Sequence, residues 1–419
     1  MIISRQKYLD KLIAHQRNGR IKIVTGIRRV GKSYLLFELF RSHLINSGVD
    51  RAHIIEIQLD NRLFSELRDP DKCLSFIVEK VKDEGQYYLL IDEVQMMKEF
   101  EDVLNTCLHI KNLDTYVTGS NSKFLSKDIA TEFRGRGDEI YVRPLSFAEF
   151  WSVKTELSFD RAWDEYITYG GLPYCVLMED YREKEEYLKA LFREVYLKDI
   201  LEHNRTKGDV AMQCLLDIMA SNIGSLTNLR KLENTFKSDG GVTISTSTIG
   251  RYLEMLEDAF LLQRVERYDV KGRKYIGTQQ KYYFVDLGLR NARLNFRQIE
   301  PTHLMENAIY NELRRRGYSV DVGIVEIYAR RDDGSHQRVQ TEVDFVCNRG
   351  AQKVYVQSAF ALPSPEKQQQ EERPLKSIND SFSKFVIVKD DILLRRDQSG
   401  IVTMGLREFL MRDDSLELL

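Results

Sequence analysis

Cysteine is sparse in this 419-residue chain, and no two cysteines form a C-x-x-C pair. The five cysteines are Cys73, Cys107, Cys175, Cys214 and Cys347. This scatter argues against a zinc ribbon and against a disulfide framework, and it fits a reducing compartment. The chain also lacks an apolar run long enough to cross a bilayer, and its first residues lack the apolar core of a signal peptide. The sequence therefore predicts a soluble, cytoplasmic protein without membrane contact.

An excess of positive charge is also missing. Charged residues make up 30% of the chain, yet 62 basic and 64 acidic residues leave a formal net charge of −2. A chain that binds nucleic acid over a broad surface usually carries a basic field. Any nucleic-acid contact must therefore come from a local patch. At this length we expect two to four domains with several apolar cores.

What the sequence does contain is a glycine-rich loop between a predicted strand and a predicted helix. The segment "GIRRVGKS" (26–33) follows the apolar segment 21–25 and precedes a segment with helical apolar spacing. Its spacing matches G-x-x-x-x-G-K-[ST], in which backbone N–H groups surround phosphate oxygens. Lys32 would reach the β- and γ-phosphates, and the Ser33 hydroxyl would ligate Mg²⁺. An ordinary glycine-rich turn is the alternative, but the flanking strand and helix favour ATP binding.

Two acidic residues follow a later predicted strand. The segment "LLIDE" ends in Asp92 and Glu93. A carboxylate at the end of a buried strand is where the Walker-B acid holds Mg²⁺, so Ser33 and Asp92 are the predicted metal ligands. Glu93 is placed to activate the attacking water as a general base. An acidic strand end that caps the next helix is the alternative, and two acids downstream of a phosphate loop favour the catalytic interpretation.

Two polar segments are candidates for contact with the γ-phosphate. "VTGSNS" carries Ser120 and Asn121 at the tip of a predicted strand, where a sensor would orient water, although a plain serine-rich turn has the same composition. "FRGRGDE" carries Arg134 and Arg136, and a guanidinium suits neutralisation of transition-state charge, in cis or across a subunit boundary. Arg136 is the predicted finger, with solvated surface arginines as the alternative. The residues predicted to bind the nucleotide are Gly26, Arg29, Val30, Gly31, Lys32, Ser33, Tyr34 and Ser120.

The order of the motifs resembles that of a known family. "TGIRRVGKS", "LLIDEVQ", "VTGSNS", "RGRGDEIYVRPLSFAEF", "YGGLP" and "YLKDI" together resemble the AAA-type ATPases of bacteria and archaea that carry a C-terminal DUF4143 region. The resemblance covers nearly the whole chain. It implies that Gly31, Lys32 and Ser33 form Walker A, that Asp92 and Glu93 form Walker B, and that the "TGS" turn is the sensor. It leaves the cellular partner open.

The pattern of predicted elements divides the chain into four parts of an α/β protein. Strands and helices alternate over residues 1–150, which predicts a P-loop ATPase domain with a parallel sheet and helices on both faces. Residues 151–208 are interpreted as a helical lid or linker and 209–300 as a winged-helix-like unit. Residues 301–419 resemble a restriction-endonuclease-like α/β domain. The segment 363–374 fits a loop or the exposed start of a helix.

The winged-helix-like unit is interpreted mainly as a protein-docking or structural element. Its second helix, from about Ser245, presents Arg251 together with acidic residues that would repel phosphates. These acidic residues are Glu254, Glu257 and Asp258. The wing around Gly272 is more basic, with Lys271, Arg273, Lys274 and Lys281. Contact with nucleic acid through the wing is thus left open but not favoured.

The C-terminal third carries an incomplete metal-nuclease pattern. Glu306, Asp344 and Gln357 stand in the order of a site that normally combines Glu, Asp and a Glu-x-Lys pair. Gln357 replaces an acid and Ala359 replaces the lysine, so we predict that this domain does not cleave nucleic acid. Lys353, which strand alternation places on the face of Gln357, is the residue able to restore such chemistry.

The residues together predict an Mg²⁺-dependent ATPase whose nucleotide state moves C-terminal interaction domains. Its ligands would be ATP and ADP, its partner an unidentified protein, and its oligomeric state is left open. One alternative is a nucleotide-gated adaptor with very slow turnover. The other is a nucleic-acid enzyme that uses the nuclease-like domain.

Overall fold

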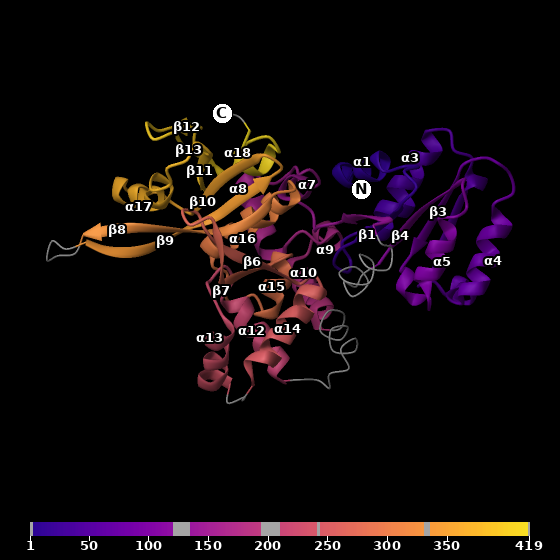
Figure 1. The fold of residues 1–419 in the computed structure, drawn as a ribbon, viewed down its shortest axis with the longest axis horizontal. Coiled ribbons are helices and arrows are strands. Elements are labelled where there is room, and N and C mark those ends of the chain that lie inside the picture. The colour runs from indigo at the N-terminus through magenta and orange to yellow at the C-terminus, as the bar shows by residue number, and fades with distance from the viewer. Residues whose placement is uncertain (1–2, 120–134, 194–209, 241–243, 331–335, 418–419) are drawn as a thin grey trace. The chain divides into compact units, whose positions relative to one another are not determined.

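The fold consists of two compact units along the chain (Figure 1). The computed structural model describes residues 3–119, 135–193, 210–240, 244–330 and 336–417. The first unit comprises Met1–Pro144 with Asp258–Phe260, and the second comprises Leu145–Glu257 with Leu261–Leu419. Within these described ranges, no helix has both the length and the apolar character needed to cross a membrane.

The first unit is built on a parallel sheet in the order β2-β3-β4-β1-β5. Its strands are β1 (Ile21–Thr25), β2 (Ile54–Gln58), β3 (Tyr87–Asp92), β4 (Leu113–Thr118) and β5 (Gly137–Tyr141). Every residue of β1 and β3 is buried, as expected for central strands of a parallel sheet covered on both faces. Because all five strands are parallel, the segments that follow them meet at one edge of the sheet.

Helices cover both faces of this sheet (Figure 1). Buried side chains of α4 (Pro70–Lys80) and α5 (Phe100–Cys107) share one core with the strands. On the other face, Phe40 packs against Tyr116 with ring centroids 4.5 Å apart. The helices of that face are α1 (Gln6–Ala14), α2 (Lys32–Tyr34), the π-helical turn η1 (Leu35–Phe40) and α3 (Arg41–Asn46). Helix α4 ends at Lys80, because Val81 adopts an extended conformation.

The second unit combines helices with a mixed sheet in the order β12-β13-β11-β10-β9-β8-β6-β7. Its strands are β6 (Leu262–Asp269), β7 (Lys274–Phe284), β8 (Ser319–Arg330), β9 (His336–Arg349), β10 (Gln352–Ala359), β11 (Ser383–Val388), β12 (Arg395–Arg396) and β13 (Ile401–Gly405). Its first helices are α7 (Phe147–Trp151), α8 (Phe159–Tyr169), α9 (Pro173–Leu177), α10 (Tyr181–Ala190), α12 (Val210–Ser221) and α13 (Leu229–Thr235). The others are α14 (Thr246–Asp258), α15 (Leu287–Arg293), α16 (Pro301–Arg315), α17 (Pro365–Lys376) and α18 (Leu406–Met411). Of the two alternatives for 363–374, the structure has the helix, and Ser364 caps it.

The β6–β7 hairpin belongs to the same sheet as the C-terminal strands. β6 pairs in parallel with β8, with Arg267 opposite Val322. The regions predicted as separate parts, 209–300 and 301–419, therefore share one sheet, and the four-part division stays a prediction. Helices α12, α13 and α14 precede the hairpin, and the winged-helix-like unit stays a prediction.

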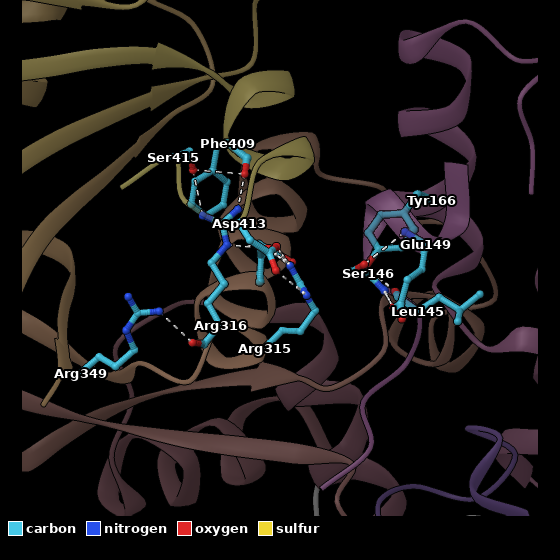
Figure 2. A network of polar contacts seen from close by, with 11 residues as sticks. Leu145, Ser146, Glu149, Tyr166, Arg315, Arg316, Arg349, Phe409, Asp413 and Ser415 are labelled. Atoms are coloured by element: carbon cyan, nitrogen blue, oxygen red, sulfur yellow. Dashed lines mark hydrogen bonds and ion pairs between the residues drawn. The ribbon is translucent and has the colours of Figure 1, made fainter. Parts of the chain in front are cut away.

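The start of the second unit is fixed by backbone and side-chain hydrogen bonds (Figure 2). Ser146 caps α7 in a reciprocal capping box with Glu149. The Tyr166 hydroxyl donates to the Leu145 carbonyl at 3.0 Å, and the Leu145 N–H donates to the Gly171 carbonyl at 2.8 Å. Two of the motifs noted in the sequence, "VRPLSFAEF" and "YGGLP", thus meet at Leu145.

Asp286 explains the glycine pair of "YGGLP". Its carboxylate accepts the N–H of Gly171 at 2.8 Å and that of Leu289, at the start of α15, at 3.0 Å. A Cβ at Gly170 would lie 2.3 Å from an Asp286 carboxylate oxygen, so a side chain has no room there. Burial raises the pKa of Asp286 to about 6, although these hydrogen bonds act to lower it.

The end of α16 holds the C-terminal segment (Figure 2). Arg316 donates to the Ser415 hydroxyl at 2.8 Å and also contacts the Phe409 carbonyl. Arg315 forms an ion pair with Asp413. Residues after α18 are therefore tied back to the core of the second unit.

Candidate nucleotide site

The glycine-rich loop connects β1 to α2 at the edge where the parallel strands end. Its φ angles are positive at Gly26 (135°), Arg29 (65°) and Gly31 (94°). Gly26 needs to be glycine, because a Cβ there would lie 2.2 Å from the Val142 carbonyl oxygen. A loop with this alternation presents its N–H groups to an anion, and the following helix adds partial positive charge.

Lys32 lies inside this loop with only 5% of its surface exposed. Its ammonium donates to the carbonyl oxygens of Gly26 at 3.0 Å and Ile27 at 3.1 Å. Burial lowers the pKa of Lys32 to about 8, while the nearby carboxylates of Glu93 and Asp92 act to raise it. A buried cation held by neutral carbonyls fits a phosphate ligand, because phosphate oxygens are stronger acceptors.

Asp92, Glu93 and Thr118 meet where β3 and β4 end. The Thr118 hydroxyl donates to the Asp92 carboxylate and accepts the Glu93 N–H at 3.0 Å. Burial raises the pKa of Asp92, while hydrogen bonds from the hydroxyls of Thr118 and Ser33 lower it. The two predicted metal ligands, Ser33 and Asp92, thus lie near each other. A hydroxyl next to a carboxylate is a donor set that suits Mg²⁺.

Glu93 adopts a left-handed conformation with φ 49° and is partly buried. Its carboxylate accepts a hydrogen bond from the Gln95 side chain. The predicted base is therefore engaged by its own chain in this conformation.

Thr118 is a site residue that the sequence analysis did not single out. It is the first residue of the "TGS" turn, two residues before Ser120, and no separate role was predicted for it. The feature that could have indicated its role is a hydroxyl group at the last position of β4, which lies next to β3, the strand that ends in Asp92. Strand order decides which residues are neighbours, and strand order cannot be read from one segment.

The remaining predicted nucleotide contacts are of two kinds. Arg29 and Tyr34 are exposed beside the loop, whereas the Val30 side chain is fully buried, so only its backbone could face a nucleotide. The predicted sensors Ser120 and Asn121, together with Arg134, lie outside the described residues.

Arg136 is not brought to this edge of the sheet. It precedes β5, and its carbonyl accepts the N–H of Ile21, the first residue of β1. The phosphate loop follows the last residue of β1, which lies about 13 Å away along the strand. The position of Arg136 therefore disagrees with a finger acting in cis. A finger acting across a subunit boundary stays a prediction.

The second unit has a polar cluster where the sequence suggested a nuclease-like pattern. The Lys281 ammonium of β7 lies 2.9 Å from Glu306 of α16 and 2.5 Å from Glu342 of β9. The Tyr283 hydroxyl donates to the same Glu306 oxygen at 2.6 Å. Lys281 therefore neutralises much of the charge of the two carboxylates.

Asp344 is buried beside this cluster. Its N–H donates to the Gln357 side-chain oxygen at 3.3 Å, and its carboxylate accepts the Ser358 N–H at 2.8 Å. Burial raises the pKa of Asp344 well above its usual value, and the Glu306 charge adds to the rise. Across the described part of the chain, no three His, Cys, Asp or Glu side chains are arranged to hold a metal ion.

Two lysines lie elsewhere than the sequence suggested. Lys281, assigned to the basic wing, is only 4% exposed, so it adds nothing to the wing surface. Lys353 has its ammonium over the rings of Tyr268, Tyr355 and Phe382, at 5.2 to 5.4 Å from the ring centroids. The lysine that joins the acidic cluster is Lys281, which comes from a strand some 70 residues earlier than Lys353.

Two known domain families match the chain. Residues 18–151 match AAA_14, described as an AAA domain, and residues 160–300 match DUF8612, a domain of unknown function. With the parallel sheet of the first unit, the first match establishes an AAA-type P-loop fold. The predicted DUF4143 region is not shown by these matches.

Two relatives are similar over most of their length. An uncharacterized protein of Haemophilus influenzae is 34% identical over 391 residues, which cover 92% of this chain and 93% of that protein. An uncharacterized protein of Methanocaldococcus jannaschii is 28% identical over 377 residues, which cover 86% of this chain and 79% of that protein.

Likeness to solved structures is weaker. The ORC1 protein of Aeropyrum pernix in complex with DNA has a TM-score of 0.30 at 12% identity, covering 70% of this chain and 92% of that chain. AMPPCP-bound DnaA from Aquifex aeolicus has a TM-score of 0.31 at 13% identity, covering 61% of this chain and 89% of that chain. Scores this low carry no argument about function.

Proposed function

This chain belongs to the same protein family as the Haemophilus influenzae protein, and we propose that it binds ATP with Mg²⁺ and hydrolyses the β–γ phosphoanhydride. The observation that carries the proposal is the meeting of Lys32, Ser33, Asp92 and Glu93 at one edge of the parallel sheet. The buried charge of Lys32 and the hydroxyl–carboxylate pair beside it are the groups that a metal-bound triphosphate requires.

Each residue would have a separate task. Lys32 would exchange its bonds to loop carbonyls for bonds to the β- and γ-phosphates, and Ser33 and Asp92 would hold Mg²⁺. The metal ion, when bound, would neutralise charge on the phosphate oxygens. Glu93 would accept a proton from the attacking water. Thr118 would act as a positioning residue, because it fixes Asp92 and the Glu93 backbone.

We also propose that the nucleotide state acts on the second unit through the link that starts at Val142. The Val142 N–H donates to the Thr25 carbonyl at 2.8 Å, and the Val142 carbonyl lies directly against Gly26 of the phosphate loop. Leu145, three residues later, is held within the second unit by Gly171 and Tyr166. A shift of the loop backbone would therefore displace a short link whose far end is fixed.

A nucleotide-gated switch with very slow turnover is the second candidate function. It is favoured by the hydrogen bond between Gln95 and Glu93, which engages the carboxylate that would have to accept a proton. ATP would be bound in both cases, and only the first function requires steady release of phosphate.

The test compares ATP binding by calorimetry with phosphate release for the native chain and two variants. Lys32→Ala is expected to lose tight ATP binding, because it removes the buried cation. Glu93→Gln is expected to keep ATP binding while turnover falls by roughly 10²–10⁴-fold. Lys98→Ala, which changes an exposed lysine of the same unit, serves as the matched control.

Unchanged ATP affinity in Lys32→Ala would show that the loop does not bind phosphate. If the native chain binds ATP but releases phosphate no faster than Glu93→Gln, the nucleotide-gated switch becomes the favoured function and the ATPase proposal is wrong.

A further inference from the structure

The outer edge of β7 pairs with another segment over only a few residues. β7 is the last strand of the eight-stranded sheet, and among the described residues its outer edge has the isolated bridge of Thr227 to Gln280 and a hydrogen bond from the Gly224 N–H to the Tyr282 carbonyl at 3.2 Å. In this bridge each N–H donates to the other residue's carbonyl at 2.9 Å. The next residue, Asn228, caps α13 by accepting the Lys231 N–H, so the chain turns into a helix and leaves β7.

A cavity of about 240 Å³ lies where the chain leaves this edge. Its lining includes Leu229 of α13, Gly250 of α14 and Gly277 of β7. A Cβ added at Gly277 would meet no atom within 4 Å, and one at Gly250 would meet only Leu229, at 3.7 Å. The two glycines therefore keep the space beside the strand open.

The charge in this cavity is mainly negative. Glu254 and Glu257 of α14 line it together with Arg264 of β6. Arg264 lies 3.6 Å from Glu257 and balances that carboxylate. Glu254 is exposed, and among the described residues no ion pair to it is found. One carboxylate is thus left to attract a cationic group.

We propose that this cavity and the adjoining edge, here called the β7 groove (Leu229, Gly250, Glu254, Gly277 and Gln280), bind an extended peptide that carries a lysine or arginine. Strands at the edge of a sheet have unpaired N–H and C=O groups, which an extended peptide can pair with. The peptide would continue the antiparallel pairing that Thr227 begins, along residues 276–279 of β7, where the register between β6 and β7 shifts and residues 277–280 have no partner among the described residues of β6. Its basic side chain would lie beside Glu254, and an apolar neighbour would pack on Leu229. The same carboxylate disfavours the phosphates of DNA.

The experiment selects ligands from a displayed library of random ten-residue peptides on the full chain. Recovered peptides are expected to share one basic position flanked by residues that favour strands. A recovered peptide, made synthetically and followed by fluorescence anisotropy, should bind Glu254→Lys about tenfold more weakly than the native chain. Gly250→Leu, which fills the cavity, should abolish binding. Glu84→Lys makes the same charge change at an exposed site of the first unit and should have no effect.

Hydrogen exchange gives a second measurement, because those amides of residues 276–279 that face the outer edge of β7 should exchange more slowly once a peptide pairs with it. Circular dichroism and the Tm of each variant establish that it folds. The proposal is overturned if no peptide is recovered, if the recovered peptides lack a basic position, or if Glu254→Lys binds them as the native chain does. It is also overturned if duplex DNA binds the native chain and not Gly250→Leu. No nucleotide is needed, so the result does not depend on ATP hydrolysis.

Discussion

Thr118 connects the two acids of the nucleotide site through one hydroxyl group. Thr118→Val keeps the shape of the side chain but removes the donor to Asp92 and the acceptor for the Glu93 N–H. Because residues that orient metal ligands typically contribute 10–100-fold, turnover with Mg²⁺ should fall by roughly that factor. Phosphate release measures the effect. Thr118→Ser retains the hydroxyl and should restore most of the activity, whereas equal losses in both variants would point to packing instead.

Lys32 gives ATP binding a pH dependence of known sign. Its pKa is lowered to about 8 by burial, so the free protein loses this proton as the pH rises through 8. ATP requires the charged form, and affinity should therefore be constant below pH 8 and fall above it by at most tenfold per pH unit. Calorimetry between pH 7.5 and 9.5 measures the change. In Lys32→Arg, whose charge does not titrate in this range, any slope that persists belongs to another group.

At the scale of elements, Asp286 links α15 to the Gly170–Gly171 turn, and the burial of its carboxyl group makes the free energy of unfolding depend on pH. Burial raises the pKa of Asp286 to about 6, so the folded state holds a proton that the unfolded chain releases near pH 4. The free energy of unfolding should therefore decrease by about 3 kcal/mol between pH 3 and 7 through this group. Denaturant unfolding at a series of pH values measures the decrease. In Asp286→Asn the free energy of unfolding should decrease less over this pH range. An equal decrease in the variant and the native chain would mean that another group causes it.

The sequence predicted local features better than distant ones. Strand, loop and helix around Lys32 form one continuous segment, so spacing was enough to assign them. The position of Arg136 depends on β5 pairing with β1, and the burial of Lys281 depends on contacts with α16 and β9. Neither the β5–β1 pairing nor the contacts of Lys281 can be recognised from the residues next to Arg136 or Lys281 in the sequence. The role of Thr118 was missed for the same reason, since it follows from β4 lying next to β3.

At the scale of the whole molecule, we expect no metal-dependent cleavage of DNA or RNA. The ammonium of Lys281 is shared between Glu306 and Glu342, and the amide of Gln357 stands where a third acid would be needed. The measurement is a cleavage assay on single- and double-stranded substrates with Mg²⁺ or Mn²⁺. Cutting that disappears in Asp344→Ala would prove this expectation wrong and assign nuclease activity to the second unit.

Because β6 pairs with β8, one sheet contains strands from both residues 209–300 and residues 301–419. A gene rearrangement that joined another C-terminal segment after residue 300 would leave the side of β6 that faces β8 without its partner strand. Exposed strand edges promote aggregation, so such a recombinant would seldom be viable. The two segments should therefore be inherited together, and members of the family that differ in one should show compensating changes in the other.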